Sequence, residues 1–176
     1  HAFILAANLA KLNYHVCVSV YSTFMQRSYD QIAHDVARIH APVTVLVDRS
    51  GLVGNDGETH QGIYDSPLLY ATPNVNVMMA TNINEAYQIF NKAMNNKEAT
   101  FIRFPRAYIK RSEVDHKYQL RDFNKIKDGS DIAIVGVGPL TNDLLKELIS
   151  SDVAIYSVIN LKPIAKSLVN ELLNFK

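Results

Sequence analysis

The alternation of short apolar runs with longer amphipathic stretches is the feature that most constrains how this chain can fold. The short runs are rich in β-branched residues, which is typical of buried strands. Strands are predicted at residues 15–20, 43–47, 75–80 and 100–104. Helices are predicted at residues 2–12, 25–40 and 84–95. Strands and helices that alternate in this way predict an α/β fold with a parallel sheet and right-handed crossovers.

A polar, charged stretch at residues 107–130 interrupts the alternation and is predicted to be a linker between domains. The alternation restarts after it. Strands are predicted at residues 131–137 and 153–159, and helices at residues 141–150 and 164–175. The sequence therefore predicts one α/β domain at residues 1–106 and the beginning of a second α/β domain at residues 131–176.

The charge balance argues against whole classes of partner. The chain of 176 residues carries 18 Lys and Arg against 17 Asp and Glu, so no net field attracts it to nucleic acid or an anionic membrane. No apolar run approaches the ~20 residues that span a bilayer.

The single cysteine, Cys17, allows no internal disulfide, which fits a reducing, cytoplasmic setting. Its position in a predicted strand predicts a buried, inert thiol. Both chain ends lie inside predicted helices, so we expect a fragment of a longer protein.

The loop at residues 48–62 is the strongest candidate for a functional site. It follows a predicted strand, holds four glycines and lacks hydrophobic periodicity, and ligand sites of open α/β sheets gather at the carboxyl ends of strands. Arg49 offers a planar fork for phosphate or carboxylate, His60 can transfer protons near neutral pH, and Asp56 can orient it. The loop is neither a P-loop nor a dinucleotide fingerprint. The alternative is a glycine-rich turn whose polar residues are solvated.

Two further stretches come directly after predicted strands. Residues 21–27 run from a strand into a helix, where Phe24 can present a flat face to a heteroaromatic ring and Arg27 can contact an anion. The alternative places Phe24 in the core and Arg27 on the surface. Arg106, which closes the motif Arg103-Phe-Pro-Arg106, can also bind an anion. Its alternative is a solvated arginine beside a proline.

Other polar residues give weaker signals. His34 and His40 lie six positions apart on a predicted helix, so they fall on different faces and do not form a metal-binding pair of the i, i+4 kind. The stretch Gly136-Val-Gly138 is predicted to be a tight turn rather than a phosphate site. No metal site is predicted within the chain.

Taken in order, these stretches resemble the 1-deoxy-D-xylulose-5-phosphate synthase family of transketolase-like thiamine-diphosphate enzymes, over nearly the whole chain. The matching stretches are His1-Ala2, Tyr21-Ser-Thr-Phe-Met-Gln-Arg-Ser-Tyr-Asp-Gln31, His34-Asp35-Val36, Asp48-Arg-Ser-Gly51, Gly54-Asn-Asp-Gly57, Thr59-His-Gln-Gly62, Arg103-Phe-Pro-Arg106, Ile132-Ala-Ile-Val-Gly-Val-Gly138 and Val158-Ile-Asn-Leu-Lys-Pro163. The combination of Tyr-Ser-Thr-Phe with Asp-Gly-x-Thr-His-x-Gly separates this family from related transketolases and from β subunits of oxo-acid dehydrogenases.

The resemblance implies a parallel-sheet pyrimidine-binding domain followed by the beginning of a transketolase C-terminal domain. It implies decarboxylation of pyruvate and two-carbon transfer to D-glyceraldehyde 3-phosphate, the first step of isoprenoid synthesis by the non-mevalonate route, with thiamine diphosphate and Mg²⁺ as cofactors. Enzymes of this family are homodimers. The alternatives are another transketolase-like enzyme, an oxo-acid dehydrogenase β subunit, or a non-catalytic α/β module on the same fold.

The resemblance also assigns binding roles. It implies that Phe24 stacks on the aminopyrimidine ring of the cofactor and that Arg27 lies beside this ring. It further implies that the side chains of Tyr21, Arg49 and Arg106 form the site for the phosphate of the acceptor. Two arginines and a phenol suit a dianion in a partly dry cleft, where charge-assisted hydrogen bonds are strong.

The implied catalytic residues are His60 and Asp56. His60 bonds the reacting carbonyl oxygen or carries its proton, while Asp56 holds a hydroxyl of the acceptor or orients His60. In the family a Glu-Gln pair precedes the residues that match His1-Ala2, so the acid that protonates the pyrimidine is expected outside this chain, as are the ligands of Mg²⁺. Ala107 stands after Arg106, where the family usually has glycine.

Overall fold

The computed structural model describes residues 1–106 and 113–175, which form two compact units. The first unit holds residues 1–78 and 89–106, and the second holds residues 79–88 and 113–175. Of the predicted linker, residues 107–112 lie outside the described residues, and Ala107 is among them.

The first unit contains the strands and helices that the sequence predicts for its α/β domain, together with short helical turns. The elements in chain order are α1 (Ala2–Lys11), β1 (Val16–Tyr21), α2 (Ser22–Met25), η1 (Gln26–Ser28), α3 (Tyr29–Gln31), η2 (Ile32–Ala37), β2 (Val43–Asp48), η3 (Glu58–His60), α4 (Asp65–Ala71), β3 (Val75–Met79), α5 (Ile83–Met94) and β4 (Ala99–Arg103). The division between the units passes through β3 and α5.

The sheet of the first unit is parallel where its pairing is resolved, as the alternation predicts. Its strands lie in the order β1-β2-β4-β3, and both β1 and β4 pair with β2 in parallel register. Val43, Val45 and Val47 of β2 are at most 1% exposed, because a central parallel strand is covered on both faces. The predicted α/β class with a parallel sheet is confirmed.

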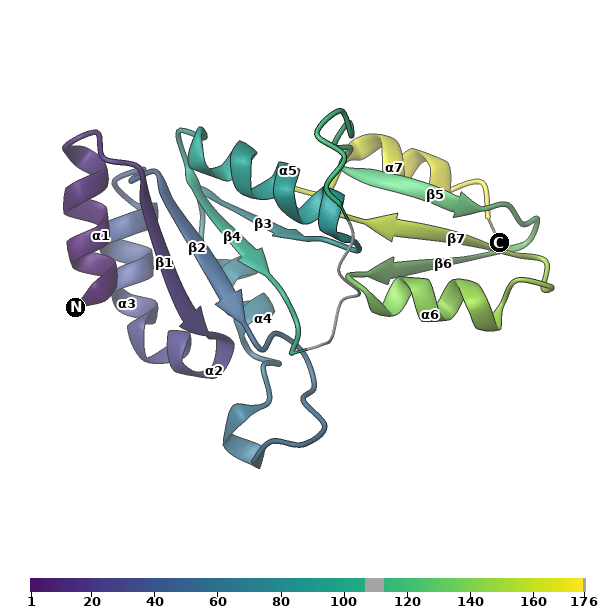
Figure 1. Cartoon of the computed structure of the whole chain (residues 1–176), viewed down its shortest axis with the longest axis horizontal. Helices are drawn as coiled ribbons and strands as arrows, with labels where there is room; N and C mark the ends of the chain where they lie inside the picture. Colours follow the sequence, from purple (N-terminus) through teal and green to yellow (C-terminus); the bar gives the residue numbers. More distant parts are fainter. Residues whose placement is uncertain (107–112, 176) are drawn as a thin grey trace. The chain divides into compact units, whose positions relative to one another are not determined.

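Helix α1 covers the outer part of this sheet. It contacts β1 and the η2 turn, and Figure 1 shows it beside β1 and α3. The buried residues of α1 are Phe3, Ala6, Ala7 and Ala10. Alanines on this face let the helix approach the strands closely, while Phe3 fills the remaining space.

The predicted helix at residues 25–40 differs from the observed one. The helical segment starts earlier, at Ser22, and is split into α, 3₁₀ and π turns. In the π turn, Arg38 N–H donates to the Ala33 carbonyl at 3.0 Å, an i→i+5 bond. This wider turn lets Ile32 and Ala37, which are five positions apart, both reach the core. Apolar spacing alone did not distinguish this turn from a regular helix.

Cys17 is exposed, so the prediction that it is buried is wrong. It lies on β1, the outermost strand of the sheet order, where Cys17 and Ser19 are exposed and Val16, Val18 and Val20 are half-buried. The β-branched composition correctly predicts a strand. It does not show that the strand has a neighbour on one side only.

The second unit has a three-stranded sheet and two helices. Its elements are β5 (Phe123–Lys127), β6 (Ile132–Val137), α6 (Leu140–Glu147), β7 (Val153–Val158), β8 (Asn160–Lys162) and α7 (Lys166–Leu172). Strands β6 and β7 are parallel, whereas β5 pairs with β7 in antiparallel register. Gly136 and Val137 still belong to β6, and the turn predicted at Gly136-Val-Gly138 begins only at Gly138, which adopts a φ of 68° and whose carbonyl accepts from Thr141 N–H at 3.1 Å.

Strand β5 lies inside the predicted linker. Its sequence, Phe-Asn-Lys-Ile-Lys, reads as polar because it forms an edge strand, where lysines are common. Another residue of the predicted linker, Tyr118, is fixed by a hydrogen bond within the second unit. The Tyr118 hydroxyl donates to the buried carboxylate of Glu85 at 3.0 Å, and burial, followed by the Glu85 charge, raises the pKa of Tyr118 above its ordinary value. The polar composition here therefore does not mark a structureless segment.

Candidate functional site

The predicted site residues of the first unit come from the carboxyl ends of its strands. Tyr21 is the last residue of β1, Arg49 follows β2 directly, and Arg106 comes three residues after β4. Because parallel strands end at the same edge of a sheet, these three side chains lie on one side of the unit. They converge there on the loop between β2 and α4, residues 49–62, which we call the β2–α4 loop.

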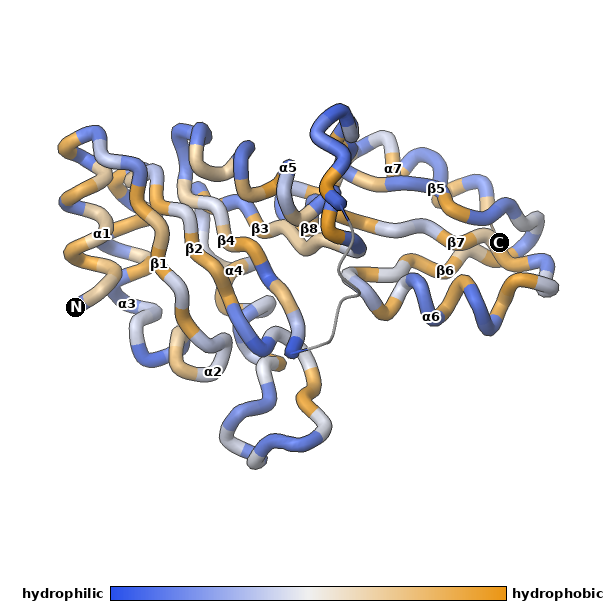
Figure 2. Tube along the Cα trace, in the orientation of Figure 1, coloured by the Kyte–Doolittle hydropathy of each residue, from blue (hydrophilic) through white to orange (hydrophobic). Residues whose placement is uncertain are grey.

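The β2–α4 loop is closed at its neck by two glycines. Gly51 and Gly62 exchange both backbone hydrogen bonds, at 2.7 and 2.8 Å. A side chain at Gly62 would collide with the Arg49 carbonyl oxygen and would lie 2.8 Å from the Ser22 hydroxyl oxygen. Figure 2 shows that the tip of the loop is mainly hydrophilic. The loop thus has a defined neck, while much of its tip is exposed to solvent.

Arg49 lies at the centre of the site. It adopts a left-handed φ of 55°, and its Nη1 forms an ion pair with Asp56 Oδ2. Its Nη2 donates to the Tyr21 hydroxyl at 3.1 Å, and its guanidinium carbon lies 4.2 Å from the centre of the Tyr21 ring. The side chains of Arg49 and Asp56 are only 21% and 16% exposed, so this pair is weakly screened by water.

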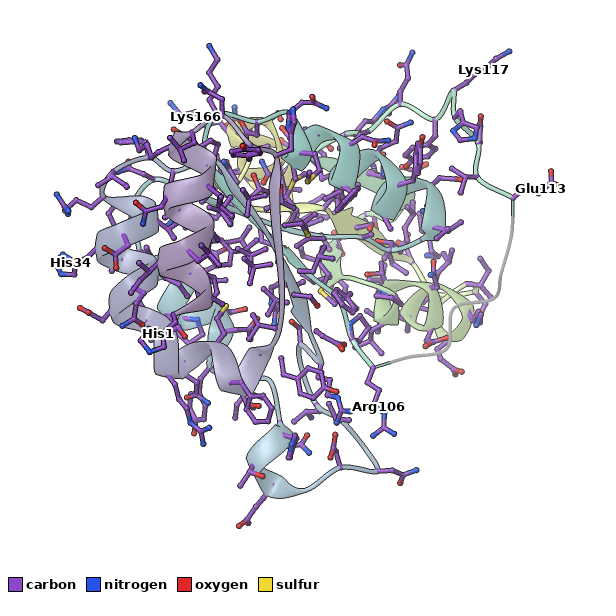
Figure 3. All side chains as sticks on the ribbon, turned by 60° about the vertical axis from the view of Figure 1, so that its left-hand side comes forward. His1, His34, Arg106, Glu113, Lys117 and Lys166 are labelled. Atoms are coloured by element: carbon purple, nitrogen blue, oxygen red, sulfur yellow. The ribbon has the colours of Figure 1, made fainter. Side chains whose placement is uncertain are left out.

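Arg106 adds a second guanidinium to the same carboxylate. Its Nη1 lies 3.5 Å from Asp56 Oδ2 and donates to the Asn55 carbonyl at 3.4 Å. Figure 3 labels Arg106, which extends beside the β2–α4 loop. Its side chain is 52% exposed, so Arg106 is partly solvated but not free. Two guanidinium groups that share one carboxylate leave a net positive charge, which suits an anionic ligand.

An aromatic surface borders the group formed by Arg49, Asp56 and Arg106, which we call the charged cluster. The rings of Tyr21 and Phe24 stack with centres 5.3 Å apart and an angle of 22°. Phe24 is 41% exposed, so it is not a core residue. Arg27 lies over this ring, with its guanidinium carbon 5.8 Å from the ring centre. The structure therefore offers a flat, accessible aromatic face with a cation beside it.

His60 connects the aromatic surface with the charged cluster. Its ring meets the Phe24 ring edge-on, with centres 5.5 Å apart. Its Nδ1 lies 3.8 Å from Asp56 Oδ1 and 3.1 Å from the Thr59 hydroxyl oxygen. All seven predicted site residues thus lie within one connected set of contacts. Their roles in binding and catalysis stay predictions.

A buried ion pair behind the loop was missed from the sequence. The side chain of Asp65, at the start of α4, is fully buried and accepts from Arg103 Nε at 2.6 Å and Nη2 at 3.2 Å. The Ser50 hydroxyl donates to the Val47 carbonyl at 3.0 Å and also lies 3.4 Å from Asp65 Oδ2. The Asp65–Arg103 pair therefore connects α4 with the end of β4, and Ser50, the residue after Arg49, contacts the same carboxylate. An arginine at the end of a buried strand is the one signal that pointed to it.

Gln61 is a second residue that the sequence did not single out. Its side-chain amide bonds back to the backbone of its own loop, at Val53 and Gly57. Nothing in residue type or spacing distinguishes this glutamine from a solvated one, because its partners are backbone atoms.

Within residues 1–106 and 113–175, no three His, Cys, Asp or Glu side chains are grouped so that they could hold a metal ion. In the same residues, no helix has the length and apolar character needed to cross a membrane.

Comparison with known proteins then assigns the family. The family described as transketolase, pyrimidine binding domain, matches residues 1–111. The chain belongs to this family. The pyrimidine-binding domain therefore comprises the sheet, the β2–α4 loop and the charged cluster of the first unit.

The whole chain, pyrimidine-binding domain included, is similar to curated enzymes. It is 40% identical over 180 residues to 1-deoxy-D-xylulose-5-phosphate synthase of Exiguobacterium sibiricum, covering 98% of this chain and 28% of that protein. It is 36% identical over 182 residues to the synthase of Halothermothrix orenii, covering 99% of this chain and 29% of that protein. The chain thus spans less than a third of the length of these relatives.

Solved structures share the fold of the pyrimidine-binding domain and of the residues after it. A split-gene transketolase, described as an inactive β4 tetramer, superposes with a TM-score of 0.85 and 21% identity, over 99% of this chain and 58% of that chain. A transketolase from Pichia stipitis superposes with a TM-score of 0.73 and 20% identity, over 91% of this chain and 25% of that chain. At these identities the likeness concerns the fold alone.

Proposed function

We propose that this chain is part of a 1-deoxy-D-xylulose-5-phosphate synthase and contributes its pyrimidine-binding domain and the beginning of its C-terminal domain. The proposed reaction is decarboxylation of pyruvate and transfer of the remaining two-carbon unit to D-glyceraldehyde 3-phosphate. One observation carries the proposal beyond the similarity to curated synthases: Arg49, Arg106 and Tyr21 converge on one side of Asp56, next to an exposed aromatic face. A phosphorylated acceptor and a heteroaromatic cofactor need these two surfaces side by side.

The aromatic face fits the aminopyrimidine ring of thiamine diphosphate. The Tyr21 ring stacks against Phe24, which is still 41% exposed to solvent. Phe24 can therefore stack on a flat ring of a ligand. The Arg27 guanidinium lies over the Phe24 ring, 5.8 Å from its centre, as a cation beside the proposed ring site. When bound, thiamine diphosphate supplies the carbanion chemistry, and the protein orients it. We propose that Mg²⁺ and the diphosphate are held by parts of the enzyme outside this chain.

The charged cluster fits the phosphate of the acceptor. Arg49 and Arg106 each point an Nη1 at Asp56 Oδ2, so both guanidinium groups are already directed at a single anionic oxygen. The Tyr21 hydroxyl, which accepts from Arg49, can donate its own proton to a phosphate oxygen. A dianion bound here gains charge-assisted hydrogen bonds from three side chains.

His60 and Asp56 fit the handling of protons at the reacting carbonyl. His60 lies beside Phe24 and within 3.8 Å of Asp56 Oδ1, which puts an imidazole between the cofactor face and the acceptor site. In this position it can donate a hydrogen bond or a proton to the carbonyl oxygen. Asp56 can orient the imidazole or accept a hydrogen bond from an acceptor hydroxyl.

The proposal extends to the setting of the complete enzyme. We propose a cytoplasmic homodimer with pyruvate and D-glyceraldehyde 3-phosphate as substrates and with no nucleic-acid or membrane partner. The second candidate is a transketolase-like enzyme with a ketose donor, which the fold of the solved transketolases supports.

A donor-specificity assay of the full-length protein separates these candidates. With thiamine diphosphate and Mg²⁺ present, we expect pyruvate and D-glyceraldehyde 3-phosphate to give 1-deoxy-D-xylulose 5-phosphate and carbon dioxide. Turnover only with a ketose phosphate donor would replace the proposal with a transketolase. Absence of thiamine diphosphate binding in calorimetry would instead favour a non-catalytic module.

A further inference from the structure

We propose that Gln61 is a positioning residue for the phosphorylated acceptor, because its side-chain amide holds the β2–α4 loop in the shape that directs Asp56 at the two arginines. The inference rests on the proposed function and adds a residue to it. Gln61 follows His60 and precedes the neck glycine Gly62. It reaches into the loop instead of out to the ligand, so it acts through its neighbours.

The amide of Gln61 forms hydrogen bonds with both of its ends. Its Oε1 accepts from Val53 N–H at 2.7 Å. Its Nε2 donates to the Val53 carbonyl at 2.9 Å and to the Gly57 carbonyl at 3.2 Å, and it lies 3.5 Å from the Asp56 carbonyl. One side chain thus links the outgoing and returning halves of the loop.

These bonds fix the backbone on both sides of Asp56. Val53 is buried, with 5% exposure, and anchors one end of the tied segment. Gly57, at the other end, also donates its N–H to Asp56 Oδ1 at 3.2 Å. The Asp56 carboxylate therefore has one fixed direction, with Oδ2 toward Arg49 and Arg106 and Oδ1 toward His60.

An amide of this length is well suited to the task. Oε1 supplies an acceptor and Nε2 supplies two donors, and the loop uses all three. Methionine has nearly the same shape but none of these bonds. Glutamate keeps the acceptor for Val53 N–H, loses both donors and brings a negative charge close to the proposed phosphate site.

The inference predicts an effect on one substrate, which a general loss of folding would not produce. In a less constrained loop, the side chains of Asp56, Arg49 and Arg106 should adopt a wider range of conformations. This should weaken binding of the acceptor's phosphate. Pyruvate and thiamine diphosphate do not use this cluster under the proposed function. The Michaelis constant of the phosphorylated acceptor should therefore change while the other constants stay near their wild-type values.

The test compares Gln61→Met and Gln61→Glu in the full-length enzyme, with Gln119→Met as the matched control. Gln119 is an exposed residue outside the first unit. For Gln61→Met we expect the KM of D-glyceraldehyde 3-phosphate to rise about tenfold, as loss of one to two net hydrogen bonds predicts. We expect the KM of pyruvate and the Kd of thiamine diphosphate to stay within about twofold. With unphosphorylated D-glyceraldehyde as the acceptor, we expect a clearly smaller increase in KM, because the contacts of the arginines with the phosphate are absent.

Several outcomes would overturn the inference. An unchanged KM for D-glyceraldehyde 3-phosphate would do so, as would equal increases for the phosphorylated and unphosphorylated acceptors. If Gln61→Met does not fold, Gln61→Asn decides by the same comparison, since it keeps a neutral amide that is one methylene shorter. A wild-type enzyme without synthase activity would overturn the proposed function and this inference with it. An active wild type with unaltered Gln61 variants would overturn the inference alone.

Discussion

At the scale of single residues, the two arginines of the site differ in burial although they meet the same carboxylate oxygen. Arg49 is 21% exposed and Arg106 is 52% exposed. Arg49 also bonds the Tyr21 hydroxyl, whereas Arg106 bonds the Asn55 carbonyl at the loop tip. Electrostatic interactions are stronger where water is excluded. The two guanidinium groups should therefore contribute unequally to binding of an anion.

This inequality leads to a first prediction for the full-length enzyme. We expect Arg49→Met to raise the KM of D-glyceraldehyde 3-phosphate by about a hundredfold and Arg106→Met by about tenfold, since charge-assisted bonds contribute about 1.5–3 kcal/mol each. Steady-state kinetics with varied acceptor provide the measurement. Arg121→Met, at an exposed position of the second unit, is the control. A larger effect at Arg106 than at Arg49 would contradict the burial argument.

A second prediction concerns the neck glycine. Gly62→Ala places a methyl group against the Arg49 carbonyl oxygen and 2.8 Å from Ser22 Oγ. The Ser22 side chain is 1% exposed, so it has little room to move. We expect the free energy of unfolding to fall by about 3 kcal/mol, the upper part of the usual overpacking range. Denaturant titration measures this loss.

Gly54→Ala is the matched control for that variant. Gly54 belongs to the same loop, but no atom lies within 4 Å of the position that its added methyl group would take. Its stability should stay within about 0.5 kcal/mol of wild type, as for most surface substitutions. Equal losses for the two variants would show that the neck is not the sensitive point.

At the scale of elements, the buried Asp65–Arg103 pair joins the start of α4 to the end of β4. The Asp65 side chain is fully buried and the Arg103 side chain is 12% exposed. Removal of the Asp65 carboxylate breaks a buried ion pair and both of its hydrogen bonds to Arg103, and breaking such a pair costs about 3–5 kcal/mol. We expect Asp65→Ala to lose stability in this range, as measured by urea unfolding followed by circular dichroism.

The exposed pair of Asp143 and Lys146 provides the comparison. Their side chains are 65% and 74% exposed, and the ion pair measures 3.0 Å. Such pairs contribute about 0–1 kcal/mol, so Asp143→Ala should be close to wild type. If Asp65→Ala were as mild as Asp143→Ala, the buried pair would not support the β2–α4 loop.

The elements also show what a sequence can and cannot predict. Strands such as β2 were predicted well because a central parallel strand is a short run rich in β-branched residues. Helix α4 was missed: it has only seven residues, with Pro67 in its first turn. Strand β5 was missed because an edge strand can be polar on its outer side. The prediction failed for α4 because the helix is short, and for β5 because the strand lies at the edge of its sheet.

The same limit applies to the candidate site. Tyr21, Arg49 and Arg106 could be singled out as candidates, because each lies at or shortly after the end of a strand that is visible in the sequence. Asp65 and Arg103 lie 38 positions apart, and their contact depends on how α4 meets β4. Contacts of this kind follow from the fold and cannot be read from local patterns.

At the scale of the whole molecule, the chain holds one surface of a proposed two-sided cofactor site. The first unit offers the aromatic face of Phe24 and the charged cluster. Curated relatives are more than three times as long as the matched segment. Under the proposed function, the diphosphate and Mg²⁺ bind elsewhere in the enzyme.

This division leads to a prediction about cofactor affinity. We expect the 176-residue chain alone to bind thiamine diphosphate with a Kd at least a hundredfold above that of the full-length enzyme, because stacking on one ring is worth only about 0.5–1.5 kcal/mol beyond area burial. Isothermal titration calorimetry with Mg²⁺ present makes the comparison. Equal affinities would show that these residues hold a complete cofactor site.

The closed neck of the β2–α4 loop has an evolutionary consequence. Gly51 and Gly62 pair directly, so the residues between them can be replaced, lengthened or shortened without a change in the distance between β2 and α4. Phe24 and Arg27 lie outside the loop and would keep their positions through such exchanges. The part of the proposed acceptor site that Asp56 and His60 form can therefore diverge by exchange of this one segment, while the ring-stacking residues are inherited unchanged.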